Sequence, residues 1–142
     1  MKRLFATAIL ALLPILSFAE EPAWGTFTNE PVDGLIWEYK RGSLDLAKND
    51  DGSIYWTYIF RTSKKGGTKF DFVKIAVPAR GCAKQSGTLF ILNLNNEKQA
   101  EIQFVFDGGT LGSAIAQNIC KQGDMVLEYR KSKEAEPNPT ST

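Results

Sequence analysis

The sequence predicts an α+β protein: an antiparallel sheet of about six strands, one short helix in the second half of the chain, and one disulfide. Apolar and polar residues alternate in several short segments, which is the period of a strand with one buried face. One later segment repeats its apolar residues every three or four positions, as an amphipathic helix does. Strands in sequence followed by a helix are typical of an antiparallel α+β domain or a small half-barrel.

The chain begins with the pattern of a secretory signal peptide. Lys2 and Arg3 precede an apolar run, and Ala19 ends a small-residue cleavage motif. The apolar run contains a proline and is short for a bilayer span. We therefore expect residues 1–19 to be removed on export, so that the protein works in a bacterial periplasm, or secreted, or at the cell surface.

Charge and length then limit the class of protein. Cleavage removes two of the 17 basic residues and none of the 16 acidic ones, which leaves a net charge of −1. A nearly neutral chain has no overall field that favours nucleic acid. The 123 remaining residues suffice for one domain. No second apolar run approaches the length of a membrane span, so we expect no stable membrane insertion after cleavage.

We predict a single domain over residues 34–130. Residues 20–33 are rich in Pro, Glu and Gly, which predicts an irregular lead-in. Residues 131–142 include two prolines and almost nothing apolar, which predicts a disordered tail. The part between them contains no internal repeat and no linker.

Two segments near the start of this domain predict an antiparallel hairpin. Apolar side chains alternate from Leu35 and continue beyond Gly42 to Leu46, and they alternate again over residues 54–60. The polar turn 48–52 joins the two segments. The faces that carry the tryptophans are expected to point into the core.

The third strand, over residues 70–77, changes phase along its length. This change predicts a bulge near Phe72 or a strand buried on both faces. Pro78 ends the strand, and Cys82 follows in a turn. Further strands are predicted over residues 89–94, 102–106 and 125–129.

One helix is predicted between the last two strands. Its apolar stripe begins at Leu111, Thr110 is its N-cap, it ends near Cys120, and Gly123 is its stop signal. The glycines before it have GGxxG rather than GxGxxG spacing, so they are interpreted as a tight turn and not as a phosphate-binding loop.

The two cysteines, Cys82 and Cys120, are expected to form a disulfide. An even number of cysteines in an oxidising compartment favours a bridge, and only one pairing is possible. The bridge would close 38 positions of chain, and the loop-entropy relation gives it about 3–4 kcal/mol. The alternative, thiols that bind metal or react, lacks a Cys-x-x-Cys spacing and a neighbouring histidine.

The chain contains no histidine, which excludes the nucleophile, acid–base and metal sites that depend on imidazole. We therefore expect no enzyme activity, no cofactor and no metal site. One enzymatic alternative stays open, a small hydrolase with two carboxylates. The acids in or beside predicted strands are Glu38, Asp45, Asp71 and Asp107.

A tyrosine and a basic loop are the candidate binding residues. Tyr55 lies on the strand face opposite Trp56, where it would form a binding patch or be covered by the helix or a second subunit. The connection after this strand is either a solvated hairpin tip or a contact for an anionic surface or an acidic protein. Its cations are Arg61, Lys64, Lys65 and Lys69.

Two segments around the cysteines resemble the surface-adhesin E family. They are KIAVPARGC over residues 74–82 and GTLGSAIAQNIC over residues 109–120. In these small exported bacterial proteins a strand leads to the first cysteine, and a later short helix ends in an Ile-Cys or Val-Cys pair. The resemblance covers the layout of residues 34–130 and implies an antiparallel sheet with a helix packed on it.

The resemblance also implies a function, that of a non-enzymatic binding protein of the bacterial envelope. The family's named example is a surface lipoprotein that binds host matrix and serum proteins. This chain lacks a lipid-attachment cysteine after its signal peptide, and only Cys82 and Cys120 carry over, as the disulfide. A periplasmic inhibitor or immunity protein, directed against a hydrolase or toxin through loop 61–69 or 84–88, is the alternative.

Overall fold

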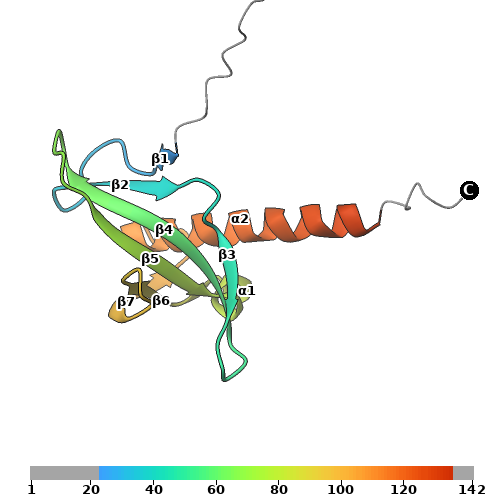
Figure 1. The fold of residues 1–142 in the computed structure, drawn as a ribbon. Coiled ribbons are helices and arrows are strands. Elements are labelled where there is room, and N and C mark those ends of the chain that lie inside the picture. Colours follow the sequence, from blue (N-terminus) through green and yellow to red (C-terminus); the bar gives the residue numbers. More distant parts are fainter. Residues whose placement is uncertain (1–22, 136–142) are drawn as a thin grey trace, which may run out of the picture.

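The computed structural model describes residues 23–135; the predicted signal peptide lies outside this part. Within it, seven strands form one antiparallel sheet in the order β1-β2-β4-β5-β6-β7, with β3 also paired to β4 (Figure 1). The predicted α+β class is confirmed. The elements are β1 (Trp24–Thr26), β2 (Leu35–Lys40), β3 (Asp45–Lys48), β4 (Ile54–Lys64), β5 (Asp71–Pro78), α1 (Ala79–Lys84), β6 (Ser86–Leu92), β7 (Lys98–Val105) and α2 (Leu111–Glu134).

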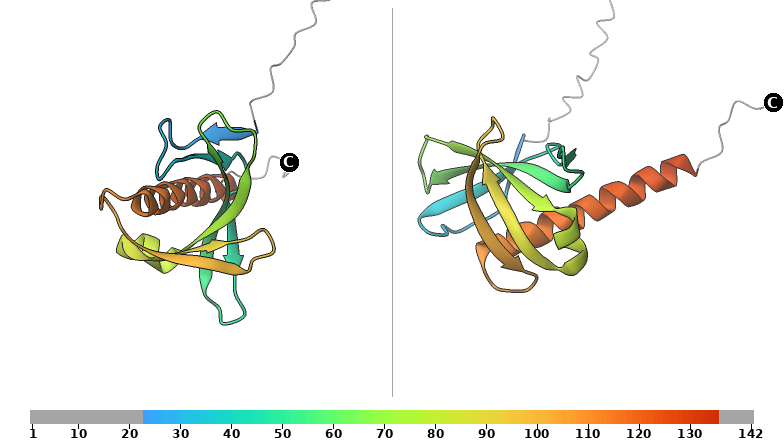
Figure 2. Two further views of the ribbon diagram at one scale, coloured as in Figure 1. Left: turned by 90° about the vertical axis from the view of Figure 1, so that its left-hand side faces the viewer. Right: turned by 90° about the horizontal axis from the view of Figure 1, so that it is seen from below.

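The sheet is strongly curved and wraps partly around α2 (Figure 2). Its inner face packs on the helix, and its outer face is turned away from it. The buried side chains alternate along β4, so that the even-numbered positions face inward. They meet apolar residues from the neighbouring strands and from α2 in a single core, which contains Trp56, Tyr58, Phe60, Ile75, Val77, Leu89, Phe104, Ile115, Ala116, Ile119 and Cys120.

Strand β4 is the centre of the sheet because it pairs along one side with two strands in turn. Residues 54–57 pair with β3, and residues 60–64 pair with β2. Between the two, the chain bends at Gly42, whose φ of 73° favours glycine. The Ser43 hydroxyl accepts a hydrogen bond of 3.1 Å from the Ile59 backbone at this gap. The predicted hairpin therefore exists, but its first arm is two strands and not one.

The structure corrects the prediction of a last strand over residues 125–129. The helix α2 does not end near Cys120 but continues without a break to Glu134. Gly123 is buried inside it, where a Cβ atom would lie 2.5 Å from Cε2 of Trp56. The glycine is therefore a point of close approach between α2 and β4, not a stop signal.

Three smaller expectations are also wrong. The lead-in predicted over residues 20–33 contains β1, which pairs with β2. The tail predicted from Lys131 is helical up to Glu134, and residues 136–142 lie outside the described part. Cys82 lies in the helix α1 and not in a turn. For the strand predicted over residues 70–77, the second of the two alternatives holds in part. The β4–β5 register passes Phe72 without a shift, which excludes a bulge there, and residues 75–77 are buried on both faces.

The predicted disulfide between Cys82 and Cys120 is confirmed, with Cα atoms 5.4 Å apart. It joins α1 to α2, because Cys82 lies in the first helix and Cys120 in the second. Since α1 directly follows β5, the bridge fixes the end of a core strand to the helix that covers the inner face.

The first prediction concerns the glycine in α2. Alanine in place of glycine usually stabilises a helix by about 1 kcal/mol. Here the added methyl group meets the Trp56 indole, so we expect Gly123→Ala to lower the free energy of unfolding by about 1–3 kcal/mol. Urea denaturation measures it. The exposed neighbour variant Asp124→Ala should change it by less than about 0.5 kcal/mol, and a Gly123→Ala protein as stable as wild type would contradict the contact.

The second prediction concerns the disulfide. The Cys82→Ser, Cys120→Ser double variant should lose about 3–4 kcal/mol of unfolding free energy, because its unfolded chain is no longer restricted by the loop. Wild-type protein in dithiothreitol should fall to the same value, whereas the double variant should not respond to reductant. Equal urea midpoints of oxidised and reduced wild type would show that the bridge contributes nothing.

Candidate functional site

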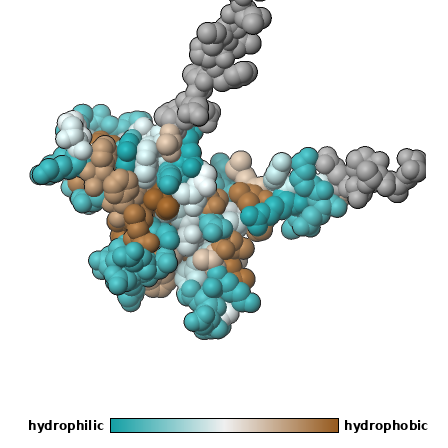
Figure 3. All heavy atoms as spheres, in the orientation of Figure 1, coloured by the Kyte–Doolittle hydropathy of each residue, from teal (hydrophilic) through white to brown (hydrophobic). Residues whose placement is uncertain are grey.

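The outer face of the sheet is the candidate functional surface, because α2 packs on the other face. Along β4 the odd-numbered side chains point outward, opposite the core residues. In the view of Figure 3, apolar residues form a band across the sheet between polar loop tips. The exposed apolar side chains on or beside this face include Phe70 and Phe72. An exposed apolar surface rimmed by polar residues is typical of an interaction site.

One end of the outer face carries a cluster that we call the aromatic–arginine patch: Trp24, Arg61, Phe70 and Phe72. The guanidinium carbon of Arg61 lies 4.5 Å from the centre of the Trp24 ring and 4.0 Å from that of Phe70. The Trp24 and Phe72 rings are 5.7 Å apart. Cation–π attraction of this kind holds the arginine between the two rings.

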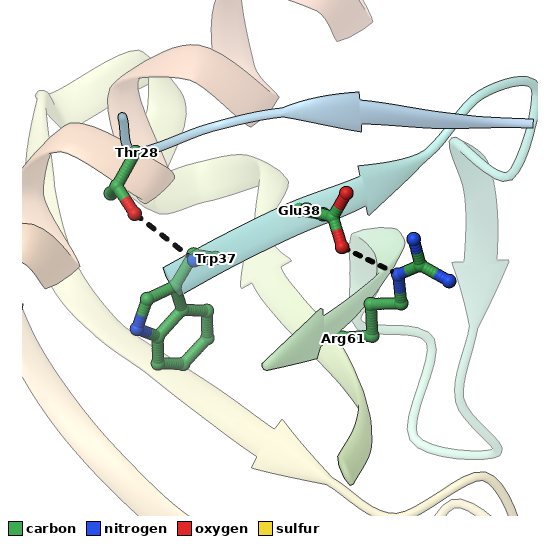
Figure 4. Close-up of polar contacts among 4 residues, drawn as sticks. All are labelled: Thr28, Trp37, Glu38 and Arg61. Carbon is green, nitrogen blue, oxygen red and sulfur yellow. Dashed lines mark hydrogen bonds and ion pairs between the residues drawn. The ribbon is translucent and has the colours of Figure 1, made fainter. Parts of the chain in front are cut away.

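A carboxylate fixes the same arginine from a third direction. Nε of Arg61 donates a hydrogen bond of 2.6 Å to Oε2 of Glu38 on β2 (Figure 4). Glu38 and Trp37 point to opposite sides of β2, so the ion pair belongs to the outer face and the indole to the core. Both charged side chains are about four-fifths buried, at 20% and 21% exposure. The arginine is therefore held in one orientation before any partner arrives.

The patch has capacity for a partner. Phe70 and Phe72 are 37% and 44% exposed. A guanidinium has five N–H donors, and within residues 23–135 the structure gives Arg61 a hydrogen bond from Nε only. Aromatic residues and arginine are the residue types enriched in protein–protein interfaces and their energetic centres.

The predicted loop cations lie next to this patch. Lys64 ends β4, and Lys69 directly precedes Phe70. Nζ of Lys65 lies 3.1 Å from Oε2 of Glu30, with both side chains largely exposed. Exposed pairs of this kind contribute little to stability. The loop therefore adds positive charge beside the patch, and the exposed ion pair with Glu30 does little to fix the position of the loop.

Tyr55 lies elsewhere. It is six residues before Arg61 on the same strand, so at about 3.3 Å per residue the two are roughly 20 Å apart. Its ring stands 6.1 Å from the ring of Phe90 on β6, in an edge-to-face pair. The predicted residues thus belong to two areas of the outer face, the aromatic–arginine patch and a second area around Tyr55.

The second area is centred on the rings of Tyr55 and Phe90, and we call it the ring-pair site. A depression lies on each side of the two rings. One has a volume of about 760 Å³ and the other about 460 Å³, and both are lined by Tyr55 and Phe90. The larger one also contains Arg80 and Lys84 from α1, together with Asp51. Hydrogen bonds from the hydroxyl and backbone of Ser53 hold the pKa of Asp51 below its ordinary value, so this carboxylate stays charged.

The acids named as hydrolase candidates do not gather at these depressions. Glu38 is in the ion pair with Arg61, and Asp107 lines a third depression of about 650 Å³ near the start of α2. In the larger of the two depressions at the ring-pair site, Asp51 is the only carboxylate in the lining. A two-carboxylate mechanism needs two acids facing each other, and the linings of these depressions offer one each or none.

Two further observations concern chemistry. Burial raises the pKa of Tyr58, with the nearby Tyr39 adding to the effect, so this tyrosine is a neutral core residue. Across residues 23–135 no group of three or more His, Cys, Asp or Glu side chains is arranged to hold a metal ion. Within the same residues no helix is long and apolar enough to cross a membrane.

Comparison with known proteins gives no assignment. No protein-family model matches the chain, and no curated protein or solved structure is significantly similar to it. The resemblance to the surface-adhesin E family stays a hypothesis that rests on the two cysteine segments.

Sequence reasoning missed the aromatic partners of Arg61. Trp24 falls in the segment predicted to be irregular. It reaches Arg61 because β1 pairs with β2 and β2 pairs with β4, the strand that contains the arginine. Phe72 was placed on a strand, and its register opposite Arg61 puts both on one face. Alternation within the strand is a signal for this placement of Phe72, whereas no local signal points to Trp24.

Proposed function

We propose that this protein is an exported binding protein of the bacterial envelope, whose aromatic–arginine patch binds an acidic segment of a protein partner. The observation that carries the proposal is Arg61, held between Trp24 and Phe70 with N–H donors left over on the outer face. A planar guanidinium binds a carboxylate through two parallel hydrogen bonds.

Preorganisation supports this assignment. Ordering a long side chain on binding costs about 0.5–1.5 kcal/mol, and Arg61 is already fixed by two rings and Glu38. The exposed Phe70 and Phe72 rings supply apolar area around the charge. The loop cations Lys64 and Lys69 attract an acidic partner at longer range and so speed association.

Export is the second part of the proposal. Residues 1–19 have the charged, apolar and small-residue regions of a signal peptide. A structural disulfide is typical of proteins outside the reducing cytoplasm. Both features favour a protein of the periplasm, the cell surface or the medium, and they agree with the non-enzymatic adhesin-like role that the resemblance implies.

A second candidate function is the periplasmic inhibitor or immunity protein. The observation that favours it is the β3–β4 hairpin, which projects beyond the rest of the sheet (Figure 1). A projecting loop suits insertion into the cleft of a hydrolase or toxin. Its tip, residues 49–53, is acidic and tightly bonded, since the Ser53 backbone donates to Asp51. In this function the hairpin, and not the patch, contacts the partner.

The third prediction tests the patch. Phe70→Ala, Phe72→Ala should bind the partner at least tenfold more weakly, which equals about 1.4 kcal/mol, because the apolar area around Arg61 is lost. The mature chain is used to capture partners from envelope extract and host serum, and affinity for each purified partner is measured by calorimetry. The control, Met125→Ala, Tyr129→Ala, removes two exposed side chains from α2 and should leave the affinity unchanged.

Two results would contradict the patch. The first is a patch variant that melts at the wild-type temperature and binds every captured protein with wild-type affinity. The second is a loss of binding in Asp50→Ala, Asp51→Ala with the patch variant unaffected, which would assign the contact to the β3–β4 hairpin and favour the inhibitor function.

The fourth prediction tests export. Protein purified from the envelope or medium of expressing bacteria should begin at Glu20 and contain no free thiol, because cleavage after Ala19 and oxidation both accompany export. Intact mass measurement with and without thiol alkylation checks both points. A chain that retains residues 1–19, or that takes up two alkyl groups, would contradict the proposed location.

A further inference from the structure

The larger depression at the ring-pair site exists because of where two strands stop pairing. The ladder between β5 and β6 ends at Ala76 and Phe90. In the same register Val77 would come opposite Leu89 and Pro78 opposite Thr88, but Pro78 has no N–H to donate. The chain leaves the sheet at this proline and enters α1. A space of about 760 Å³ therefore opens between β4, α1 and β6.

The walls of this space differ in chemistry. One wall is formed by the rings of Tyr55 and Phe90, and the other by Arg80 and Lys84. The two cations are four residues apart on α1, so they lie on one side of the helix. Both are exposed, and neither is within ion-pair distance of a carboxylate in residues 23–135. The carboxylate of Asp51 also belongs to the lining, and the charge of Arg80 contributes to lowering its pKa. Hydroxyl groups in the lining come from Ser53, Ser86 and Thr88.

A second depression continues the larger one beyond the rings of Tyr55 and Phe90. On the far side of Tyr55 and Phe90 lies the second depression, of about 460 Å³, with Lys48 and polar asparagine side chains in its lining. The two depressions form a track that passes over the ring pair, with a cation beyond the rings in each direction. A track of this kind fits an extended polymer better than a single small molecule, which would be enclosed on most sides.

We propose that the ring-pair site binds an acidic polysaccharide. A sugar ring lies with its C–H groups against the electron-rich face of the Tyr55 ring, beside the Phe90 ring, which has Nζ of Lys98 6.0 Å from its own centre. Its carboxylate or sulfate is placed between Arg80 and Lys84, and its hydroxyls exchange hydrogen bonds with Ser86 and Thr88. An acidic peptide would use the same cations, but the three hydroxyl side chains of the lining, Ser53, Ser86 and Thr88, suit the many hydroxyl groups of a sugar polymer better.

This site is distinct from the aromatic–arginine patch. Tyr55 and Arg61 are roughly 20 Å apart along β4, and no residue of the patch lines either depression. The proposal of an acidic polysaccharide site can therefore be tested independently of the proposed protein partner. Variants at one site serve as controls for the other.

The fifth prediction is tested with defined polymers by calorimetry at about 0.15 M salt, where exposed charges are partly screened. The probes are heparin, which carries sulfate, polygalacturonate, which carries carboxylate, neutral dextran, and poly-L-glutamate. The wild-type protein should bind heparin or polygalacturonate at least tenfold more tightly than dextran and poly-L-glutamate. The better of the two probes identifies the anion.

Two variants of the site and two control variants locate the binding. Arg80→Ala, Lys84→Ala should weaken binding of the acidic polysaccharide at least tenfold. Tyr55→Ala should weaken it at least fivefold with little change in its salt dependence, because a stacking contact is lost and no charge. The matched control Lys64→Ala, Lys65→Ala removes the same charge from the loop and should change the affinity less than twofold, as should Phe70→Ala, Phe72→Ala.

Three results would overturn the proposal. Equal losses in the site and loop lysine variants would indicate non-specific attraction by net charge. Absence of binding to both acidic polysaccharides would remove the ligand class. Equally tight binding of poly-L-glutamate, with the same sensitivity to Arg80→Ala, Lys84→Ala, would assign the site to an acidic peptide. Thermal unfolding of each variant confirms that a loss of affinity is not a loss of fold.

Discussion

The contact between α2 and β4 at Gly123 and Trp56 determines the rest of the structure. Because Gly123 has no side chain, the helix backbone lies directly against the indole and crosses the inner face without bending away. One turn earlier, Cys120 is held in place for its bond with Cys82, and that bond fixes α1 at the end of β5. With the inner face filled, any recognition by the sheet occurs on its outer face.

Alternation in the sequence predicted β4 because one face of this strand is buried against α2. The same reasoning failed for Met125, Leu127 and Tyr129, which also alternate but lie on α2. Met125 and Tyr129 are four residues apart and therefore share a helix face, and five residues are too few to separate the two periods. Gly123 was interpreted as a helix end because the indole that requires a glycine comes from Trp56, 67 positions earlier in the sequence.

The candidate site was predictable only in part, for a related reason. Arg61 and Tyr55 were identified by charge and by strand phase, but the structure places them in different areas, because a strand separates side chains by length even when they share a face. The rings around Arg61 come from β1 and from the connection before β5, which no local pattern joins. Arg80 was overlooked, and Lys84 was considered only as the start of loop 84–88, because α1 has six residues, too few for a helical pattern to show in the sequence.

The two proposed sites share strand β4, and the rigidity of this strand determines whether binding at one site changes the affinity of the other. Strand β4 is paired on both sides and packed on α2, and the disulfide restricts the neighbouring helices. Coupling between sites requires an element with two arrangements whose equilibrium both ligands change, and a strand held in this way offers one arrangement. Binding at the two sites is therefore expected to be independent. A partner that presents an acidic protein segment and an acidic glycan together would gain affinity through effective concentration alone.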